Sequence, residues 1–245
     1  MSEIAKFFAE VAERVDELKA DADIHALSRL WLREVTRHKY SHNFTWLGRP
    51  IIQLPQDLIA MQELIWKIKP AAIVETGIAH GGSLLFYSSM LDLVGGDGIV
   101  VGVDVDIRAH NKQAIEDHPF AKRVAMIQGS SIDPAVVAEV FRLVGDRRPV
   151  LVSLDSNHTH AHVLAELEAY SPLVVKGSYL IAFDTAIEDV PKDFIKDRPW
   201  GPGNSPKSAV HAFLKTNRRF EIDKSIDAKL SITVAPDGYL RCISD

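Results

Sequence analysis

The sequence predicts an α/β fold in which helices cover both faces of one mostly parallel, seven-stranded sheet. From residue 71 onward, short runs of apolar, β-branched residues alternate with segments of helical periodicity. Strands that are apolar along their whole length and separated by helices are typical of parallel strands buried on both faces. The last two predicted strands follow each other with almost no room for a crossover helix, so we expect them to pair antiparallel.

The first 69 residues are predicted to form a helical extension and a loop near the active site. Apolar residues recur at helical spacing over residues 2–19, and a second helical pattern covers 24–39. The prolines and the glycine of segment 42–58 indicate a loop, and a helix follows over 57–68. The amphipathic first helix either caps the core or packs against a second subunit, so we expect a homo-oligomer, a dimer or larger.

Residues 70–245 are predicted to form the sheet and its covering helices, in strict alternation. The predicted strands are 71–77, 98–106, 123–129, 149–156, 177–185, 219–225 and 229–241. The predicted helices are 82–94, 110–119, 134–144, 160–171 and 208–217. No internal repeat and no linker interrupts the pattern, so we expect a single domain over residues 1–245.

Composition excludes several classes of protein. Of the 245 residues, 47% are hydrophobic and the net charge is only −5, which is too apolar and too weakly charged for a disordered chain. A net negative charge also argues against a nucleic-acid-binding protein, which usually carries an excess of basic residues. A single cysteine, Cys242, excludes a disulfide framework and a cysteine-based metal cluster. We expect no membrane span and no signal peptide, and therefore a cytoplasmic protein.

Ligands of open parallel sheets bind at the carboxyl ends of the strands, so the loop after the first predicted strand is a candidate site. It reads ETGIAHGGS over residues 75–83. Its glycines let the backbone approach a ligand closely beside the start of a helix. No G-x-G-x-x-G pattern fits, which disfavours a dinucleotide site. The loop resembles the acidic–x–Gly–x–Gly–x–Gly loop that holds S-adenosylmethionine (SAM), with Ala79 in place of the middle glycine. The alternative is a tight turn without a ligand.

The next two strands also end in polar residues. Asp104 and Asp106 share one face of the second strand, and a carboxylate at this position accepts hydrogen bonds from a ribose diol. The spacing does not separate the two, and a solvated strand end is the alternative. Ser130 and Ser131 follow the third strand. Their hydroxyls either reach an adenine edge or cap the next helix.

The fourth and fifth strands end in Asp155 and Asp184, which places two carboxylates side by side. Neighbouring carboxylates repel each other, and a bound divalent cation removes that repulsion. The alternative is that one of the two caps a helix or pairs with Arg198. Three histidines follow Asp155 closely: His158, His160 and His162. We expect one of them to be functional, and the spacing of His158 and His162 also permits a metal pair on one helix face.

These motifs, in this order, resemble the cephalosporin-hydroxylase-like family, which includes rhamnosyl and other sugar or antibiotic O-methyltransferases. The resemblance covers the chain from about residue 45 to its end. It implies a Rossmann-like, class I, SAM-dependent and magnesium-assisted O-methyltransferase, related in mechanism to catechol O-methyltransferase. The implied acceptor is a hydroxyl of a sugar, on a glycosylated natural product or a polysaccharide.

The resemblance also implies a role for each site residue. The methionine end of SAM would lie against Glu75, Gly77, Gly81, Gly82, Ser83 and Asp155. The ribose would lie against Asp104, and the adenine near Ser130 and Ser131. Magnesium would be bound by Asp155 and Asp184. Catalysis would fall to Asp155 and to His158, which stands three residues after Asp155, where the catechol enzyme has its lysine base.

Some details depart from the family pattern or stay open. Related enzymes carry two adjacent acidic or amide residues at the second metal motif, whereas Asp184 stands between Phe183 and Thr185. The candidates for the missing ligand are Thr185, Glu188 and Asp189. The loop 190–206 is expected to close over the site together with the stretch around Trp46. Trp46 and Trp200 either stack on a sugar or are ordinary packing aromatics.

Three other functions are alternatives to the methyltransferase. An iron- and 2-oxoglutarate-dependent hydroxylase needs two histidines and a carboxylate, usually with a His-x-Asp or His-x-Glu pair, and the chain contains no such pair. A nicotinamide-dependent dehydrogenase is disfavoured by the missing glycine fingerprint. A non-catalytic subunit that binds SAM or a nucleotide is opposed only by the paired carboxylates and His158.

Overall fold

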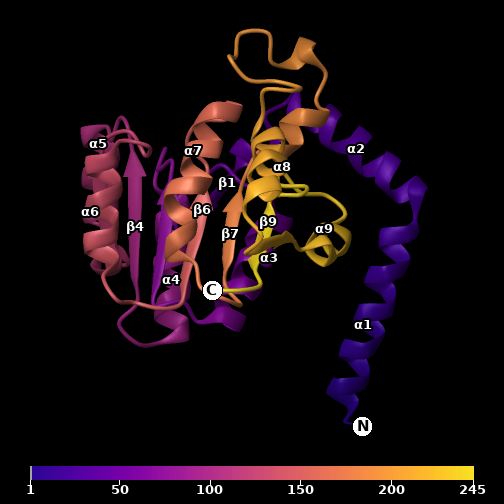
Figure 1. Cartoon of the computed structure of the whole chain (residues 1–245), viewed down its shortest axis with the longest axis horizontal. Coiled ribbons are helices and arrows are strands. Elements are labelled where there is room, and N and C mark those ends of the chain that lie inside the picture. Colours follow the sequence, from indigo (N-terminus) through magenta and orange to yellow (C-terminus); the bar gives the residue numbers. More distant parts are fainter. Residues whose placement is uncertain (1) are drawn as a thin grey trace.

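The computed structural model describes residues 2–245, and a seven-stranded sheet lies at its centre (Figure 1). The strands are β3 (Ala72–Thr76), β4 (Ile99–Asp104), β5 (Val124–Gln128), β6 (Val150–Leu154), β7 (Tyr179–Ala182), β8 (Phe220–Ile222) and β9 (Tyr239–Cys242). Their order is β5-β4-β3-β6-β7-β9-β8. Neighbouring strands from β5 to β7 are parallel, and β9 runs antiparallel to both β7 and β8. This confirms the predicted mostly parallel sheet with an antiparallel end.

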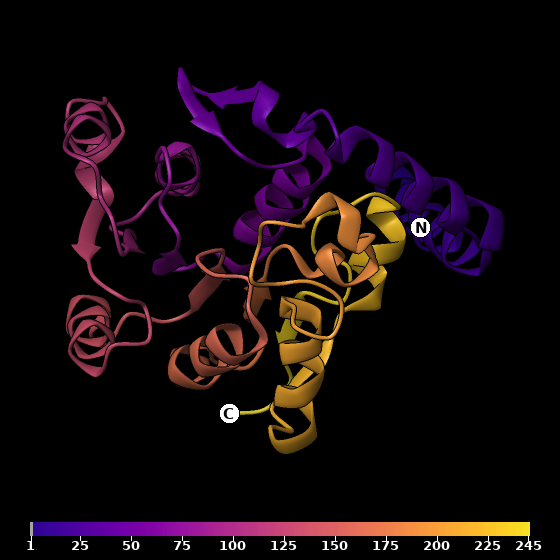
Figure 2. The same ribbon diagram turned by 90° about the horizontal axis from the view of Figure 1, so that it is seen from above.

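Helices cover both faces of the sheet (Figures 1 and 2). On one face lie α3 (Pro55–Ile68), α4 (Gly82–Val94) and α5 (Ala109–Glu116). On the other lie α6 (Pro134–Val144), α7 (His160–Tyr170) and α8 (Pro206–Thr216). Successive residues of a strand point to opposite faces, so Val74 belongs to one buried cluster and its neighbour Ile73 to the other. The strands are therefore apolar throughout because both of their faces are covered.

Two helices precede this body and lie along its side (Figure 1). They are α1 (Glu3–Ala20) and α2 (Ala22–Thr36). The two helices are separated by Asp21. Its carboxylate accepts hydrogen bonds at 2.9 Å from the backbone N–H groups of Asp23 and Ile24 and so caps α2. The C-terminal helix α9 (Lys224–Leu230) contacts α1. No residue of α1 or α2 is fully buried, and Phe8 is 64% exposed.

Short 3₁₀ turns link several of these elements. They are η1 (Tyr40–Asn43), η2 (Ala121–Arg123), η3 (Ser171–Leu173), η4 (Thr185–Asp189) and η5 (Lys192–Phe194). Within residues 2–245, no helix has both the length and the apolar character that a membrane crossing requires.

The stretch predicted as a loop before the sheet contains a β-hairpin, so that prediction is wrong in part. Strand β1 (Phe44–Trp46) pairs antiparallel with β2 (Arg49–Ile51). The two turn residues between them have positive φ angles of 47° and 87°, the signs that a type I′ hairpin turn requires. Trp46 packs its ring on Phe86 of α4 at 4.8 Å and donates a hydrogen bond to Ser89 at 3.0 Å. Trp46 is thus a packing aromatic that anchors the hairpin.

The final predicted strand, 229–241, is mostly not a strand. Helix α9 occupies its beginning, and only residues from 239 onward pair in the sheet. The physical reason is Asp57 of α3, which is buried and accepts hydrogen bonds from the Thr233 hydroxyl, from Val234 N at 3.0 Å and from the Tyr239 hydroxyl at 2.8 Å. Backbone groups near residue 234 therefore bond to a carboxylate instead of to a neighbouring strand.

A close backbone contact joins the carboxyl ends of the central strands. Gly77, just after β3, has a φ of +92°, and a Cβ atom there would lie 2.1 Å from the carbonyl oxygen of Asp155. Only glycine allows this approach. Gly77 N also donates to Val103 O of β4 at 2.8 Å, and Asp155 N donates to Thr76 O at 2.9 Å. The loops after β3 and β6 are consequently held against each other.

We expect Gly77→Ala to destabilise the protein far more than Gly96→Ala. Both glycines have positive φ angles, +92° and +81°, but a Cβ at Gly96 would have nothing within 4 Å. The strain of the positive φ should cost each variant about 1 kcal/mol, and the clash should cost Gly77→Ala roughly a further 1–3 kcal/mol. Urea denaturation of both variants measures the difference. Equal midpoints would contradict the close contact.

The buried carboxyl of Asp57 should make stability depend on pH. Burial raises the pKa of Asp57 to about 6 from 3.8, against the lowering effect of its hydrogen bonds. The folded state then holds this proton at pH values where the unfolded state has lost it. The free energy of unfolding should therefore fall as pH rises from about 4 to about 6, by up to about 3 kcal/mol from this group.

Comparison with Asp57→Asn isolates this effect from those of other buried acids. The variant should be less stable at every pH, because the amide cannot accept all three hydrogen bonds. Its stability should nevertheless fall less steeply over this pH interval than that of the unmodified chain, as followed by chemical denaturation at several pH values. Parallel pH profiles would show that Asp57 does not titrate as stated.

Candidate active site

A cavity of about 430 Å³ opens at the carboxyl ends of the central strands. The loop after β3 lines it with Gly77, β4 contributes Asp104, and β6 and β7 contribute Asp155 and Asp184. A smaller cavity of about 200 Å³ shares Gly77 and Asp104 with it and extends toward β5. The two form one groove across the strand ends, where an open parallel sheet binds its ligands.

The groove brings together three of the predicted site residues. Ligand atoms of Asp155, His158 and Asp184 all lie within 4.8 Å of one another, and His158 Nε2 is 3.2 Å from Asp184 Oδ2. Burial raises the pKa of Asp155 well above its ordinary value, and the nearby charge of Asp184 raises it further. Two carboxyls at such a separation do not both ionise readily without a cation between them.

The residues of this cluster fit a divalent metal ion. Carboxylate and amide oxygens are the donors that Mg²⁺ prefers. Besides the two aspartates, the buried side chain of Gln53 reaches the cluster, and its Nε2 donates to Asp155 Oδ2 at 3.1 Å. Within residues 2–245, Gln53 Oε1 is buried and lacks a hydrogen-bond partner. That oxygen could coordinate a cation, and the cation would offset the repulsion between the two aspartates.

The sequence gives no signal for Gln53, because it lies beyond the β-hairpin in the segment predicted as a loop. Arg49 of the same hairpin donates to the carbonyl oxygen of His80 in the β3–α4 loop at 2.6 Å and to Asn111 of α5 at 2.9 Å. Gly82 lies so close to the hairpin that a Cβ atom there would be 2.2 Å from Pro50 O. The N-terminal segment thus forms one wall of the groove.

The three residues proposed as a further metal ligand are engaged elsewhere. Thr185 donates its hydroxyl hydrogen to Pro236 O at 2.6 Å. The carboxylate of Glu188 accepts from Gly203 N at 3.0 Å and from the Ser205 hydroxyl. Asp189 pairs with Lys207 at 3.0 Å. Glu188 therefore fixes the end of the loop 190–206 through these hydrogen bonds. Gln53 is consequently the better candidate for a third metal ligand.

The structure separates the three histidines. His158 alone lies at the two carboxylates, and its ring meets Trp200 edge to face at 4.8 Å. His160 holds the loop 190–206, because its backbone N–H donates to Asn204 at 2.9 Å and its ring contacts the Ser208 hydroxyl at 2.8 Å. His162 lies in the smaller cavity, 3.0 Å from the Ser131 hydroxyl. His158 and His162 therefore do not form a metal pair.

Loop 190–206 lines the larger cavity with four of its residues, including Arg198 and Trp200, beside the cluster of Asp155, His158 and Asp184. Arg198 and Trp200 both line the larger cavity, and the Arg198 guanidinium lies 5.2 Å from the Trp200 ring centroid. Among the ion pairs of residues 2–245, none joins Arg198 to Asp155 or Asp184. The alternative that Arg198 neutralises one of these carboxylates is thus not what the structure shows.

The glycine loop contributes both lining and support. Gly77, Gly82 and Ser83 line the larger cavity, whereas Glu75 is buried behind it and accepts a hydrogen bond from the Ser83 hydroxyl at 2.7 Å. Burial raises the pKa of Glu75 to about 8. Gly81 packs against α5, where a Cβ atom would lie 2.3 Å from Ile115 Cδ1. Gly81 thus supports the loop from behind.

Asp104 and Asp106, which the sequence left equivalent, have different surroundings. Asp104 lines both cavities, and its Oδ2 accepts from the backbone N–H groups of Ile78 at 2.8 Å and Ala79 at 3.2 Å. Asp106 is 67% exposed and lies 3.4 Å from Arg108. Only Asp104 is placed to hold a ligand in the groove.

The smaller cavity contains the serines after β5. Ser130 lines it, and Ser131 points inward to donate its hydroxyl hydrogen to the buried Glu166 at 2.5 Å. Ser156 makes a similar bond to Glu166 at 2.6 Å. The cavity floor is therefore a hydrogen-bonded cluster, and Ser130 is the serine that remains available to a ligand.

Comparison with known proteins identifies the family. The family model described as Rhamnosyl O-methyltransferase/CmcI matches residues 38–243. A rhamnosyl O-methyltransferase from Mycobacterium tuberculosis (strain H37Rv) is 28% identical over 199 residues, covering 80% of this chain and 77% of that protein. One from Mycobacterium leprae is 27% identical over 198 residues, covering 80% of this chain and 82% of that protein.

Solved structures show the same fold. A structure of CmcI with magnesium and SAM superposes with a TM-score of 0.56 at 21% identity, covering 83% of this chain and 78% of that one. The apo structure of CalS11, a TDP-rhamnose 3'-O-methyltransferase, gives a TM-score of 0.53 at 19% identity, over 76% of this chain and 78% of that one. With the family match across most of its length, the chain belongs to the rhamnosyl O-methyltransferase/CmcI family and is a SAM-dependent O-methyltransferase.

Proposed function

We propose that this enzyme transfers the methyl group of SAM to a hydroxyl group of a sugar, with the help of a divalent cation such as Mg²⁺. The observation that carries the proposal is the cluster of Asp155, His158 and Asp184 in the groove beside the glycine loop. Rhamnose-directed relatives support a sugar as the acceptor, on a glycosylated natural product or a polysaccharide.

In this proposal Asp155 and Asp184 hold the cation, and Gln53 offers a third oxygen ligand. When bound, the cation supplies Lewis acidity that lowers the pKa of an acceptor hydroxyl. His158 takes the proton of that hydroxyl as general base. Asp184, 3.2 Å from His158 Nε2, then stabilises the resulting imidazolium. The sulfonium of SAM is itself the electrophile, so the protein needs no nucleophile of its own.

The rest of the groove is proposed to hold SAM. Its methionine end would lie along Gly77, Gly82 and Ser83, with Asp155 close by, while Glu75 and Gly81 support this loop from behind. Asp104 would bind the ribose hydroxyls, and the adenine would enter the smaller cavity near Ser130 and above Ser131. The loop amides bonded to Asp104 support this assignment, because they fix the carboxylate at the strand end.

The loop 190–206 is proposed as the lid of the site. Its end is fixed by Glu188 and His160, while Trp200 contacts His158 within the cavity. Trp200 is therefore proposed to hold the ring of the base, rather than to serve only as a platform for the sugar. A closed lid would exclude water from the transfer.

The arrangement favours the methyltransferase over the hydroxylase that was considered above. An iron-dependent oxygenase uses two histidines and one carboxylate, whereas this cluster has one histidine and two carboxylates. We also propose a homo-oligomer, because apolar side chains of α1 and α2, including Ile4 and Phe8, face solvent in the single chain.

Substitution of His158 should sharply reduce turnover while leaving SAM binding in place. We expect His158→Ala to lower kcat at least about 100-fold, because it removes the general base. Asp155→Asn should lower kcat similarly and should remove the stimulation by Mg²⁺. Transfer of a labelled methyl group from SAM to a panel of rhamnosides measures both. Calorimetry with S-adenosylhomocysteine is the control, and His158→Ala should bind it as the unmodified enzyme does. Unchanged kcat in His158→Ala would remove its role as base.

The ribose assignment is tested by a matched pair of aspartates. We expect Asp104→Ala to weaken S-adenosylhomocysteine binding at least tenfold, which corresponds to about 1.4 kcal/mol. Asp106→Ala should bind with unchanged affinity, because its carboxylate faces solvent two residues away. Calorimetric titration of both variants decides between them. Equal affinities would mean that Asp104 does not contact the cofactor.

A further inference from the structure

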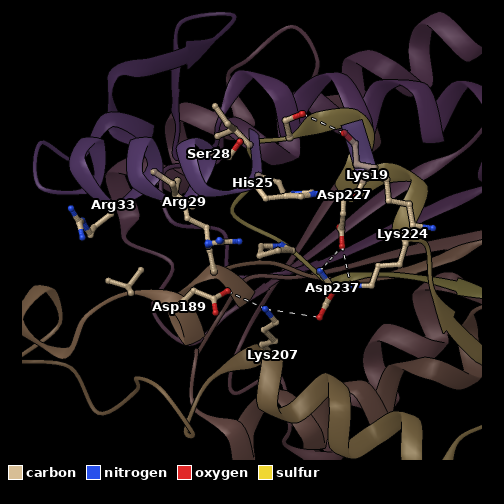
Figure 3. Close-up of a pocket in the computed structure, with 18 residues that line it drawn as sticks. Lys19, His25, Ser28, Arg29, Arg33, Asp189, Lys207, Lys224, Asp227 and Asp237 are labelled. Atoms are coloured by element: carbon tan, nitrogen blue, oxygen red, sulfur yellow. Dashed lines mark hydrogen bonds and ion pairs between the residues drawn. The ribbon is translucent and has the colours of Figure 1, made fainter. Parts of the chain in front are cut away.

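A separate cavity of about 380 Å³ lies between the first two helices and the body of the protein (Figure 3). We call α1 and α2 the arm, and this space the arm cavity. The arm contributes lining residues between 19 and 33, and the body contributes residues from η4, the start of α8 and segment 224–237. The methyl transfer proposed above gives these residues no role.

The arm wall carries positive charge that the chain does not neutralise. Lys19 ends α1 and Arg29 lies in α2, and neither forms an ion pair with a carboxylate anywhere in residues 2–245. The Arg29 side chain points into the cavity, whereas Arg33 points away from its centre and pairs with Glu34 at 2.9 Å (Figure 3). Lys19 and Arg29 are thus both unpaired, but they lie on different sides of the cavity, and Arg29 is the cation that points into it (Figure 3).

The body wall presents carboxylates that are already partly engaged. Asp189 pairs with Lys207 at 3.0 Å, and Asp237 pairs with Lys224 and lies 4.0 Å from Lys207 (Figure 3). Asp227 Oδ2 accepts from Asp237 N at 3.0 Å, but in the described chain its Oδ1 is buried without a hydrogen-bond partner. Burial raises the pKa of Asp227 to about 6. The Asp227 side chain is 17% exposed, so its carboxylate can still accept a hydrogen bond from a ligand hydroxyl at the cavity face.

These walls suit a ligand that is anionic at one end and hydroxylated at the other. Lysine and arginine bind phosphate through charge-assisted hydrogen bonds, and carboxylates accept hydrogen bonds from sugar hydroxyls. Leu32 and Ala228 add apolar surface for the carbon face of a sugar ring. We propose that the arm cavity binds a phosphorylated sugar, with the phosphate at Arg29 and the hydroxyls toward Asp227.

The arm cavity is distinct from the active site but shares a wall with it. Ala186 and Asp189 of η4 line the arm cavity, whereas Ile187 of the same turn lines the active-site cavity together with Asp184. The neighbouring segment 233–236 is divided in the same way, with Val234 on the active-site side. An occupant of the arm cavity would therefore leave the SAM groove free.

Calorimetric titration of glucose 1-phosphate into the full chain, with S-adenosylhomocysteine at saturation, tests this site. We expect a Kd of about 1 mM or tighter, and at least tenfold weaker binding by Arg29→Ala. Arg14→Ala is the matched control, since it removes the same charge from the arm at a residue that does not line the cavity. Arg29 has no ion-pair partner in the described chain, and Arg14 has only a solvent-exposed pair with Glu10 at 3.8 Å, so both variants should melt at nearly the same temperature as the unmodified protein.

Inorganic phosphate and glucose, titrated separately, test the two ends of the ligand. Each should bind more weakly than the sugar phosphate, because each meets only one wall. Equal affinity for phosphate and glucose 1-phosphate would overturn the assignment of the hydroxyl end. The site itself would be overturned by unchanged binding in Arg29→Ala, or by no binding of any hexose or pentose phosphate at concentrations up to about 10 mM. Neither result would affect the methyl-transfer proposal, whose assays use other residues.

Discussion

The contact between Gly77 and the carbonyl oxygen of Asp155 is the constraint on which the geometry of the groove depends. It joins the loop that is proposed to hold the cofactor to the strand end that carries Asp155, the proposed metal ligand, with no side chain between them. Hydrogen bonds from Gly77 N to β4 and from Asp155 N to β3 fix the same three strand ends. A methyl donor and its acceptor react only at close range and in line, so a fixed distance between these two loops suits the proposed transfer.

Around this contact the protein concentrates acidic groups that it does not pair with cations. Glu75 and Asp155 are both buried, and burial raises the pKa of each. The described chain places no arginine or lysine against Asp155; its contacts are with Gln53 and the other members of the cluster. This negative, desolvated environment matches a site that receives a metal ion and the sulfonium of SAM, because both bring positive charge.

The mostly parallel sheet can be predicted from the sequence, because apolar strands that alternate with helices indicate strands buried on both faces. The sequence also placed Asp155, His158 and Asp184 at neighbouring strand ends, which the structure brings together. It could not predict Gln53, since a residue after a short hairpin reaches the site only through tertiary packing on α4. Nor could it distinguish Asp104 from Asp106, because the difference lies in which carboxylate accepts the loop amides. The final segment was misassigned because its backbone bonds to Asp57, more than 170 positions earlier.

That buried carboxylate has a consequence for how the enzyme can be engineered. Asp57 stands before the first strand of the sheet, yet it holds the segment that runs into the last one. A minimal catalytic fragment that begins at β3 would therefore leave the hydroxyl of Tyr239 and the amide of Val234 without their acceptor in the interior. Circular permutation keeps every residue, so it would preserve these bonds as long as the new termini are not placed within α3 or between residues 233 and 239.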